Sequence, residues 1–285
     1  GKILHALAEA GTFISQLFLL LIAISVIDVC INFTNFTGIL TVDVLNWLKT
    51  ADNFTLFGQE FQLDGAVYLM LALVIAMIAT IMLGMGMPTL PAYVNVVLII
   101  GPLLAALGTS FFTAHMFVFY FAVASAITPP VAIAAFAAST ISKADPLATG
   151  FAAVRCGIVV FTIPFVFAFY PELLLIEPAQ VAQSLEGASA GKTYLPGYDG
   201  TVALGPLLWL ILKLIISLYL VASALMKFDA ANISVIEILL RLLLAVLILM
   251  KAPEISSVAL GLAIVLLAFH QFRNWAGRSR KVPEN

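Results

Sequence analysis

The chain has 285 residues, of which 63% are hydrophobic and only 10% are charged. Soluble globular domains carry about 25% charged residues, so this composition excludes a soluble domain and predicts an all-α integral membrane protein with several spans. The formal net charge is −2, and no basic patch suggests a nucleic-acid partner. No nucleophile–base arrangement and no metal-ligand spacing of His, Cys, Asp or Glu suggests an enzyme or a bound cofactor.

We expect residues 1–64 to form a scaffold segment, with a span over about 12–33, a short interfacial helix over 37–48 and a polar loop over 49–64. Asp28 lies inside the span, where a carboxylate is a candidate for a transport role. The alternative is that Asp28 hydrogen-bonds polar neighbours near an interface. The chain has no initiator Met and begins with an amphipathic stretch, so we expect a piece of a longer chain.

Residues 65–176 contain two breaks in otherwise apolar sequence, Gly-Met-Gly-Met-Pro-Thr at 84–89 and Ser-Ala-Ile-Thr-Pro-Pro at 125–130. Glycine is flexible and proline lacks an N–H, so both interrupt a helix. Irregular backbone at membrane depth survives only where it is buried in protein or lines a polar cavity. Freed carbonyls and half-helix ends then hold a cation or an anionic group, so we expect both breaks within about 10 Å of each other near the midplane.

The flanks of each break predict two different arrangements. The apolar stretches 65–83 and 90–107 are either two full spans or a re-entrant hairpin with residues 84–89 at its tip. The stretches 110–124 and 131–141 predict one helix broken in its middle, followed by a span over 149–175 that is kinked at Pro164. Asp145 is a good N-cap for that span. His115 is expected to line a cavity or cap a helix rather than relay a proton.

The C-terminal part predicts a polar extramembrane loop over 177–200 and a segment over 201–285 with three spans near 202–226, 235–250 and 255–272. Its tail is basic and should lie in the cytoplasm. Glu237 and Arg241 are four residues apart and are expected to pair with each other. Cys30 and Cys156 are expected to be small packing residues.

Residues 83–89 with Ala92 and Tyr93, then 114–121, 125–132, 144–146 and 164–171, resemble the large permease subunit of TRAP (tripartite ATP-independent periplasmic) transporters. The resemblance is closer to the fused permeases of the TAXI branch. It is strong over 65–176, weaker over 1–64 and diffuse over 177–285. Pro91 departs from the small residue that is commoner after the hairpin tip.

The resemblance implies an elevator-type carrier in the bacterial inner membrane, in which a mobile domain holds substrate and sodium between hairpins and broken helices. Family permeases have two inverted repeats, and this chain shows one, so it resembles the C-terminal half. The implied partners are a small organic anion such as a C4-dicarboxylate, a periplasmic solute-binding protein, and a small membrane subunit or a fused N-terminal half.

The site implied by the resemblance lies at the two breaks. Sodium, as the coupling ion, would bind the carbonyls of Gly84, Gly86 and Ala126 and the hydroxyls of Thr89 and Thr128, because hard cations prefer oxygen ligands. The full set of substrate- and ion-binding candidates is Gly84, Gly86, Met87, Pro88, Thr89, Asn95, Ser125, Ala126, Thr128, Pro129 and Pro130.

Two alternatives differ in function. A proton-coupled carrier or channel of similar architecture would use Asp28 or His115, and its uptake would follow pH rather than sodium. A non-transporting scaffold subunit would need neither break for any activity.

Overall fold

The structure is a computed structural model that describes residues 2–56, 59–62, 65–176, 203–229, 231–250 and 252–279. The chain divides into two compact units, one made of residues 1–151 and 167–201 and the other of residues 152–166 and 202–285. The predicted polar loop over 177–200 and the end of the basic tail lie outside the described residues.

The first unit begins with two helices and a hairpin. Helix α1 (Lys2–Phe33) starts ten residues before the predicted span, and α2 (Phe36–Asp52) follows after a short turn. Strands β1 (Asn53–Leu56) and β2 (Gln59–Gln62) then pair antiparallel, with Phe54 opposite Phe61. The prediction of a polar loop was therefore wrong over 53–56 and 59–62, where the aromatic and β-branched residues Phe54, Thr55 and Phe61 favour a strand pair.

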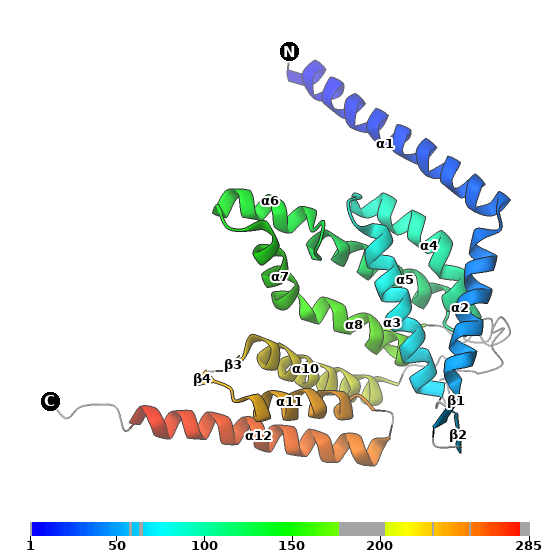
Figure 1. The fold of residues 1–285 in the computed structure, drawn as a ribbon. Coiled ribbons are helices and arrows are strands. Elements are labelled where there is room, and N and C mark those ends of the chain that lie inside the picture. Colours follow the sequence, from blue (N-terminus) through cyan, green and yellow to red (C-terminus); the bar gives the residue numbers. More distant parts are fainter. Residues whose placement is uncertain are drawn as a thin grey trace. The chain divides into compact units, whose positions relative to one another are not determined.

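The core of the first unit is a helical trio, α3 (Gly65–Gly84), α4 (Thr89–Ala106) and α5 (Phe111–Ala124), which pack against one another (Figure 1). Large apolar side chains from all three helices are fully buried between them: Leu69, Leu73, Ile100, Leu103, Leu104, Phe117 and Phe121. This packing positions the two predicted breaks, because α3 ends at the first and α5 ends at the second.

After α5 the chain forms a short 3-10 turn η1 (Ser125–Ile127), an irregular stretch and then α6 (Ile133–Ser142). Helix α7 (Pro146–Cys156) begins where Asp145 Oδ2 accepts the Ala148 N–H at 2.7 Å, which confirms the predicted N-cap. Helix α8 (Ile158–Phe169) and the turn η2 (Pro171–Leu174) follow.

The expected kink in the span over 149–175 lies elsewhere. The structure interrupts this helix at Gly157, between α7 and α8, while Pro164 lies within α8. Membrane helices tolerate an internal proline where neighbouring groups satisfy the freed carbonyl, whereas glycine is a poor helix former that ends α7. The expectation of packed cysteines was also wrong, since Cys30 and Cys156 are free and exposed.

The second unit contains α10 (Leu204–Met226), α11 (Val235–Ile248) and α12 (Pro253–Ser279), which lie side by side (Figure 1). A two-residue strand pair, β3 (Phe228–Asp229) and β4 (Ala231–Asn232), joins α10 to α11. An apolar core in this unit is built by α10, α11 and α12 together: Leu220, Leu244, Ala245, Ile248, Ala259, Leu260 and Ala263.

Helices of the described residues confirm an all-α membrane protein. Four of their helical stretches are long and apolar enough to cross a bilayer: Thr89–Ala106, Pro146–Phe169, Leu204–Met226 and Pro253–Phe272. Many large apolar side chains on these helices are exposed, which suits contact with lipid.

Candidate functional site

The first break is a tight reversal between α3 and α4. Gly86 has a φ of 82°, a left-handed conformation that glycine adopts without steric cost. The N–H of Met87 donates to the Gly84 carbonyl at 3.3 Å. Pro91 lies in the first turn of α4, where its missing N–H has no partner within the helix in any case, so this departure from the family pattern costs no hydrogen bond.

The second break interrupts a helix over several residues. Thr128 has an extended backbone after η1, and its N–H donates to the Ser125 carbonyl at 3.2 Å. The hydroxyl of Thr128 donates to the Ala124 carbonyl at 2.7 Å. Helix α6 then starts only at Ile133, so the predicted broken helix is confirmed.

The two breaks touch. A Cβ placed on Gly84 would lie 2.9 Å from Ser125 Oγ, and a Cβ on Gly86 would lie 3.7 Å from Val131 Cγ1. The predicted proximity of the breaks is therefore confirmed. Gly150 of α7, which the sequence analysis missed, also approaches the second break, with its Cβ position 2.9 Å from Pro129 Cγ. Only the tertiary packing reveals that contact.

Prolines leave backbone carbonyls at both breaks without helical partners. The carbonyl of Ala126 would bond to the N–H groups three or four residues later, but both positions are prolines, Pro129 and Pro130. The residue four positions after Gly84 is Pro88, which has no N–H to donate. The Gly84 carbonyl accepts a longer bond from the Met87 N–H instead. The Ala126 carbonyl thus lacks both helical donors, and Ala126 directly follows Ser125, whose side chain meets Gly84.

The partial charges of the helix ends around the breaks also favour ion binding. Helices α3 and α5 both bring their C-terminal ends, which carry partial negative charge, to the Gly84–Ser125 contact. Neither has a basic residue in its last turn. The N-terminal ends of α4 and α6 carry partial positive charge, and neither has an acidic residue in its first turn. The arrangement suits a cation at the paired C-terminal ends and an anion at the N-terminal ends.

Asn95 adds a side-chain oxygen near the hairpin tip. Its Nδ2 donates to Met87 Sδ at 3.7 Å, while its Oδ1 is buried and has no hydrogen-bond partner in the described part of the chain. An unpartnered buried amide oxygen is costly, so a ligand that satisfies it would be stabilised. By contrast, the hydroxyl of Ser125 donates to the Ala122 carbonyl at 2.7 Å.

Comparison with family models gives one match, over residues 1–180, to the tripartite ATP-independent periplasmic transporter, DctM component. The chain belongs to this family. Comparisons with curated proteins and with solved structures gave no match. The chain is therefore a multi-pass membrane protein with the permease role of a TRAP transporter, and DctM is a transporter family rather than an enzyme family. The match covers both breaks and ends before α10.

A histidine and a tyrosine form a polar contact beside the breaks. His115 Nδ1 lies 2.7 Å from Tyr93 Oη, which joins α5 to the outgoing leg of the hairpin, α4. Tyr93 also packs edge-on against Phe119. From the sequence, Tyr93 was recognised only as part of the family motif. The side chain of Asp28 lies outside the described part of the structure.

The described residues contain no cluster of side chains that is typical of a metal site. Among the described residues, no three His, Cys, Asp or Glu side chains are placed to share a metal ion, so a cation would depend on carbonyl, hydroxyl and amide oxygens.

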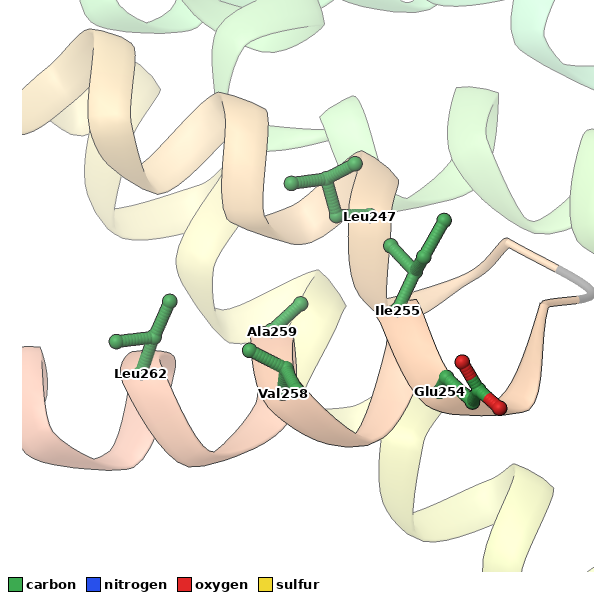
Figure 2. A pocket seen from close by; sticks show the side chains of 6 residues that line it. All are labelled: Leu247, Glu254, Ile255, Val258, Ala259 and Leu262. Carbon is green, nitrogen blue, oxygen red and sulfur yellow. The ribbon is translucent and has the colours of Figure 1, made fainter.

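A groove of about 300 Å³ lies on the second unit, between α11 and α12 (Figure 2). Its lining is apolar apart from Glu254, so it offers no set of polar groups for a small anion: Leu247, Glu254, Ile255, Val258, Ala259 and Leu262.

Proposed function

We propose that this DctM-family permease takes up a small organic anion by sodium symport, and that the coupling sodium binds where the two breaks meet. The observation that carries the proposal is the contact of two helix C-terminal ends at Gly84 and Ser125, with no basic residue in either last turn. Partial negative charge gathered in a low-dielectric setting favours a bound cation.

The ligands proposed for sodium are backbone carbonyls and side-chain oxygens. Gly84, Gly86 and Ala126 supply carbonyls, and Thr89 and Thr128 supply hydroxyls. The Ala126 carbonyl is the best supported, because its two helical donors are replaced by prolines. The Oδ1 of Asn95 is a further candidate because it is buried without a partner. Hard cations prefer such oxygen ligands.

The anionic substrate is proposed to bind beside the sodium, at the N-terminal ends of α4 and α6. Met87, Pro88, Pro129 and Pro130 shape the backbone there, and Ser125 would donate its hydroxyl to the anion once that hydroxyl is released from the Ala122 carbonyl. The bound cation would balance the charge of the anion, which explains how the two ligands are coupled. The proposed carrier is an elevator in the bacterial inner membrane. It would receive substrate from a periplasmic binding protein and work with a small subunit or a fused N-terminal half.

Uptake by the complete transporter in proteoliposomes, measured against external sodium, tests this proposal. Thr128→Val keeps the branched shape and the neighbouring prolines but deletes one oxygen. We expect it to raise the sodium concentration needed for half-maximal uptake. Thr140→Val is a matched control, because the Thr140 hydroxyl makes the same kind of bond, to the Ala137 carbonyl at 2.7 Å, on an exposed part of α6.

An unchanged sodium response in Thr128→Val would remove Thr128 from the site. Uptake that ignores sodium and follows a pH gradient would instead favour the proton-coupled carrier, with His115 and its contact to Tyr93 as the first group to test. Full activity after substitution at both breaks would favour a scaffold subunit.

A further inference from the structure

Gly150 is the one buried residue of α7, a helix that the structure describes in full. It lies inside the helix, where glycine is a poor choice because its backbone loses much freedom on folding. The helix does not need a glycine at this position to begin or to end, since Asp145 caps its start and Gly157 follows its last residue. A glycine inside a helix usually has a packing or functional reason.

The packing reason for Gly150 is the ring of Pro129 in the second break. A Cβ added to Gly150 would lie 2.9 Å from Pro129 Cγ, 3.6 Å from Pro129 Cδ and 3.6 Å from Ala132 Cβ. Carbon atoms attract each other best at about 3.5–4.0 Å, so of these three contacts only that with Cγ is too short. A methyl group at position 150 would therefore push the ring and α7 apart by about 0.6 Å.

A second glycine holds the other end of the same break. A Cβ on Gly84 of α3 would lie 2.9 Å from Ser125 Oγ, at the start of the break, whereas Gly150 of α7 meets Pro129 near its end. Ala126 and Thr128, two of the proposed sodium ligands, lie between these contacts in the sequence. The break is therefore located from two sides by residues that have no side chain.

The ring of Pro129 is stiffly linked to the proposed ligands. The ring fixes its own φ, and the peptide bond that joins it to Thr128 is planar. The Thr128 N–H donates to the Ser125 carbonyl at 3.2 Å, and its hydroxyl donates to the Ala124 carbonyl at 2.7 Å. A shift of the ring is therefore passed on to Thr128 and to the neighbouring carbonyl of Ala126.

The size of this shift is large enough to affect ion binding. Groups that bind a ligand must be held within about 0.5 Å of their working positions, which is less than the shift of about 0.6 Å. The break should yield before α7 does, because a helix has a continuous ladder of hydrogen bonds and Pro129 and Pro130 remove two donors from the break.

We propose that Gly150 is a positioning residue for the cation site. Its missing side chain leaves room for the ring of Pro129, and this sets the Ala126 carbonyl and the Thr128 hydroxyl where sodium can bind both. Gly150 does not touch the ion and acts through Pro129. The role rests on the proposed sodium symport, and it makes α7 a third element of the site beside α3 and α5.

Sodium binding to the purified complete transporter, expressed per mole of folded protein, tests this role. Gly150→Ala should bind sodium at least about tenfold more weakly than the wild type, as is typical when a supporting group of an ion site is changed. Gly261→Ala is the matched control, because a Cβ there would meet nothing within 4 Å, and it should bind sodium like the wild type.

Competition by lithium separates positioning from stability. A displaced carbonyl changes the size of the site, so the ratio of lithium to sodium affinity should change in Gly150→Ala. A loss of stability alone would leave this ratio unchanged in the protein that remains folded.

The possible failures differ from one another. Wild-type sodium affinity and an unchanged lithium ratio in Gly150→Ala, together with weaker binding by Thr128→Val, would overturn the role of Gly150 and leave the proposed function standing. No sodium binding by the wild type would overturn the sodium site and the positioning role together.

Hydrogen exchange on the wild type decides the question if Gly150→Ala does not fold. Sodium that orders the second break should slow the exchange of the α7 amides around Gly150, because the two pack together. Thr128→Val should lose this protection, and the α12 amides around Gly261 should show none in either protein. A wild type that binds sodium without any change of exchange in α7 would contradict the proposal.

Discussion

Substitution of Gly84 by alanine tests whether the contact between the two breaks is as close as the structure shows. The added Cβ would lie 2.9 Å from Ser125 Oγ and 3.3 Å from Ser125 Cβ. The hydroxyl cannot swing away freely, because it donates to the Ala122 carbonyl at 2.7 Å. Losing that bond costs about 1 kcal/mol, and overpacking a tight site costs about 1–3 kcal/mol. We therefore expect Gly84→Ala to destabilise the folded chain by about 1–3 kcal/mol.

Thermal unfolding of the full chain in detergent measures this effect, with Gly101→Ala as the control. A Cβ on Gly101, in the middle of α4, would meet Val97 Cγ2 at an ordinary 3.5 Å, and alanine favours a helix, so this variant should be as stable as the wild type or more stable. The double variant Gly84→Ala with Ser125→Ala removes the clashing oxygen. It should recover part of the loss, with an interaction energy of about 0.5–3 kcal/mol.

Two results would refute the reasoning. Equal stability of Gly84→Ala and Gly101→Ala would mean that the breaks are farther apart than the structure shows. Strict additivity in the double-variant cycle would mean that the alanine at 84 acts on something other than Ser125.

Substitutions at three other positions should change the stability of the chain. Gly86→Ala should lower the melting temperature, since its φ of 82° costs alanine about 1 kcal/mol, and Gly86→Asn should lower it less because asparagine tolerates that region. Burial and the charge of Glu172 raise the pKa of Tyr170 to about 12. The unfolded chain therefore loses this proton first above about pH 10, so stability should fall there, and Tyr170→Phe should reduce the fall. Arg241→Met removes the guanidinium that lies 2.8 Å from Asp229 Oδ2 and 2.9 Å from Glu237 Oε1, and should cost about 3–5 kcal/mol in thermal unfolding. Arg155→Met, at an exposed position, should cost little.

The breaks could be predicted from the sequence because glycine and proline act locally. Pro88 and Pro129 remove helical donors wherever the chain places them, so the ends of α3 and α5 follow from the residues alone. The contact of Gly84 with Ser125 depends instead on how α3, α4 and α5 pack, and only the family resemblance and the cost of isolated breaks in lipid suggested it.

The charge cluster of Asp229, Glu237, Arg241 and His270 in the C-terminal unit was likewise only partly predictable from the sequence. Glu237 and Arg241 are one helical turn apart, so their pairing was readable from their spacing. Asp229 and His270 are 41 residues apart and come from different elements, so nothing in the local sequence connects them. The hairpin of β1 and β2 was missed because a short polar strand pair has a weak pattern beside long apolar helices.

Direct binding of radioactive sodium to the purified complete transporter is the measurement that tests the central claim, a cation site built by the two breaks. The wild type and the control Thr140→Val should bind sodium equally. Thr128→Val should bind it at least about tenfold more weakly, as expected for the loss of one buried oxygen ligand worth about 1.4 kcal/mol or more. Equal binding by all three proteins, or no sodium binding by the wild type, would contradict the account.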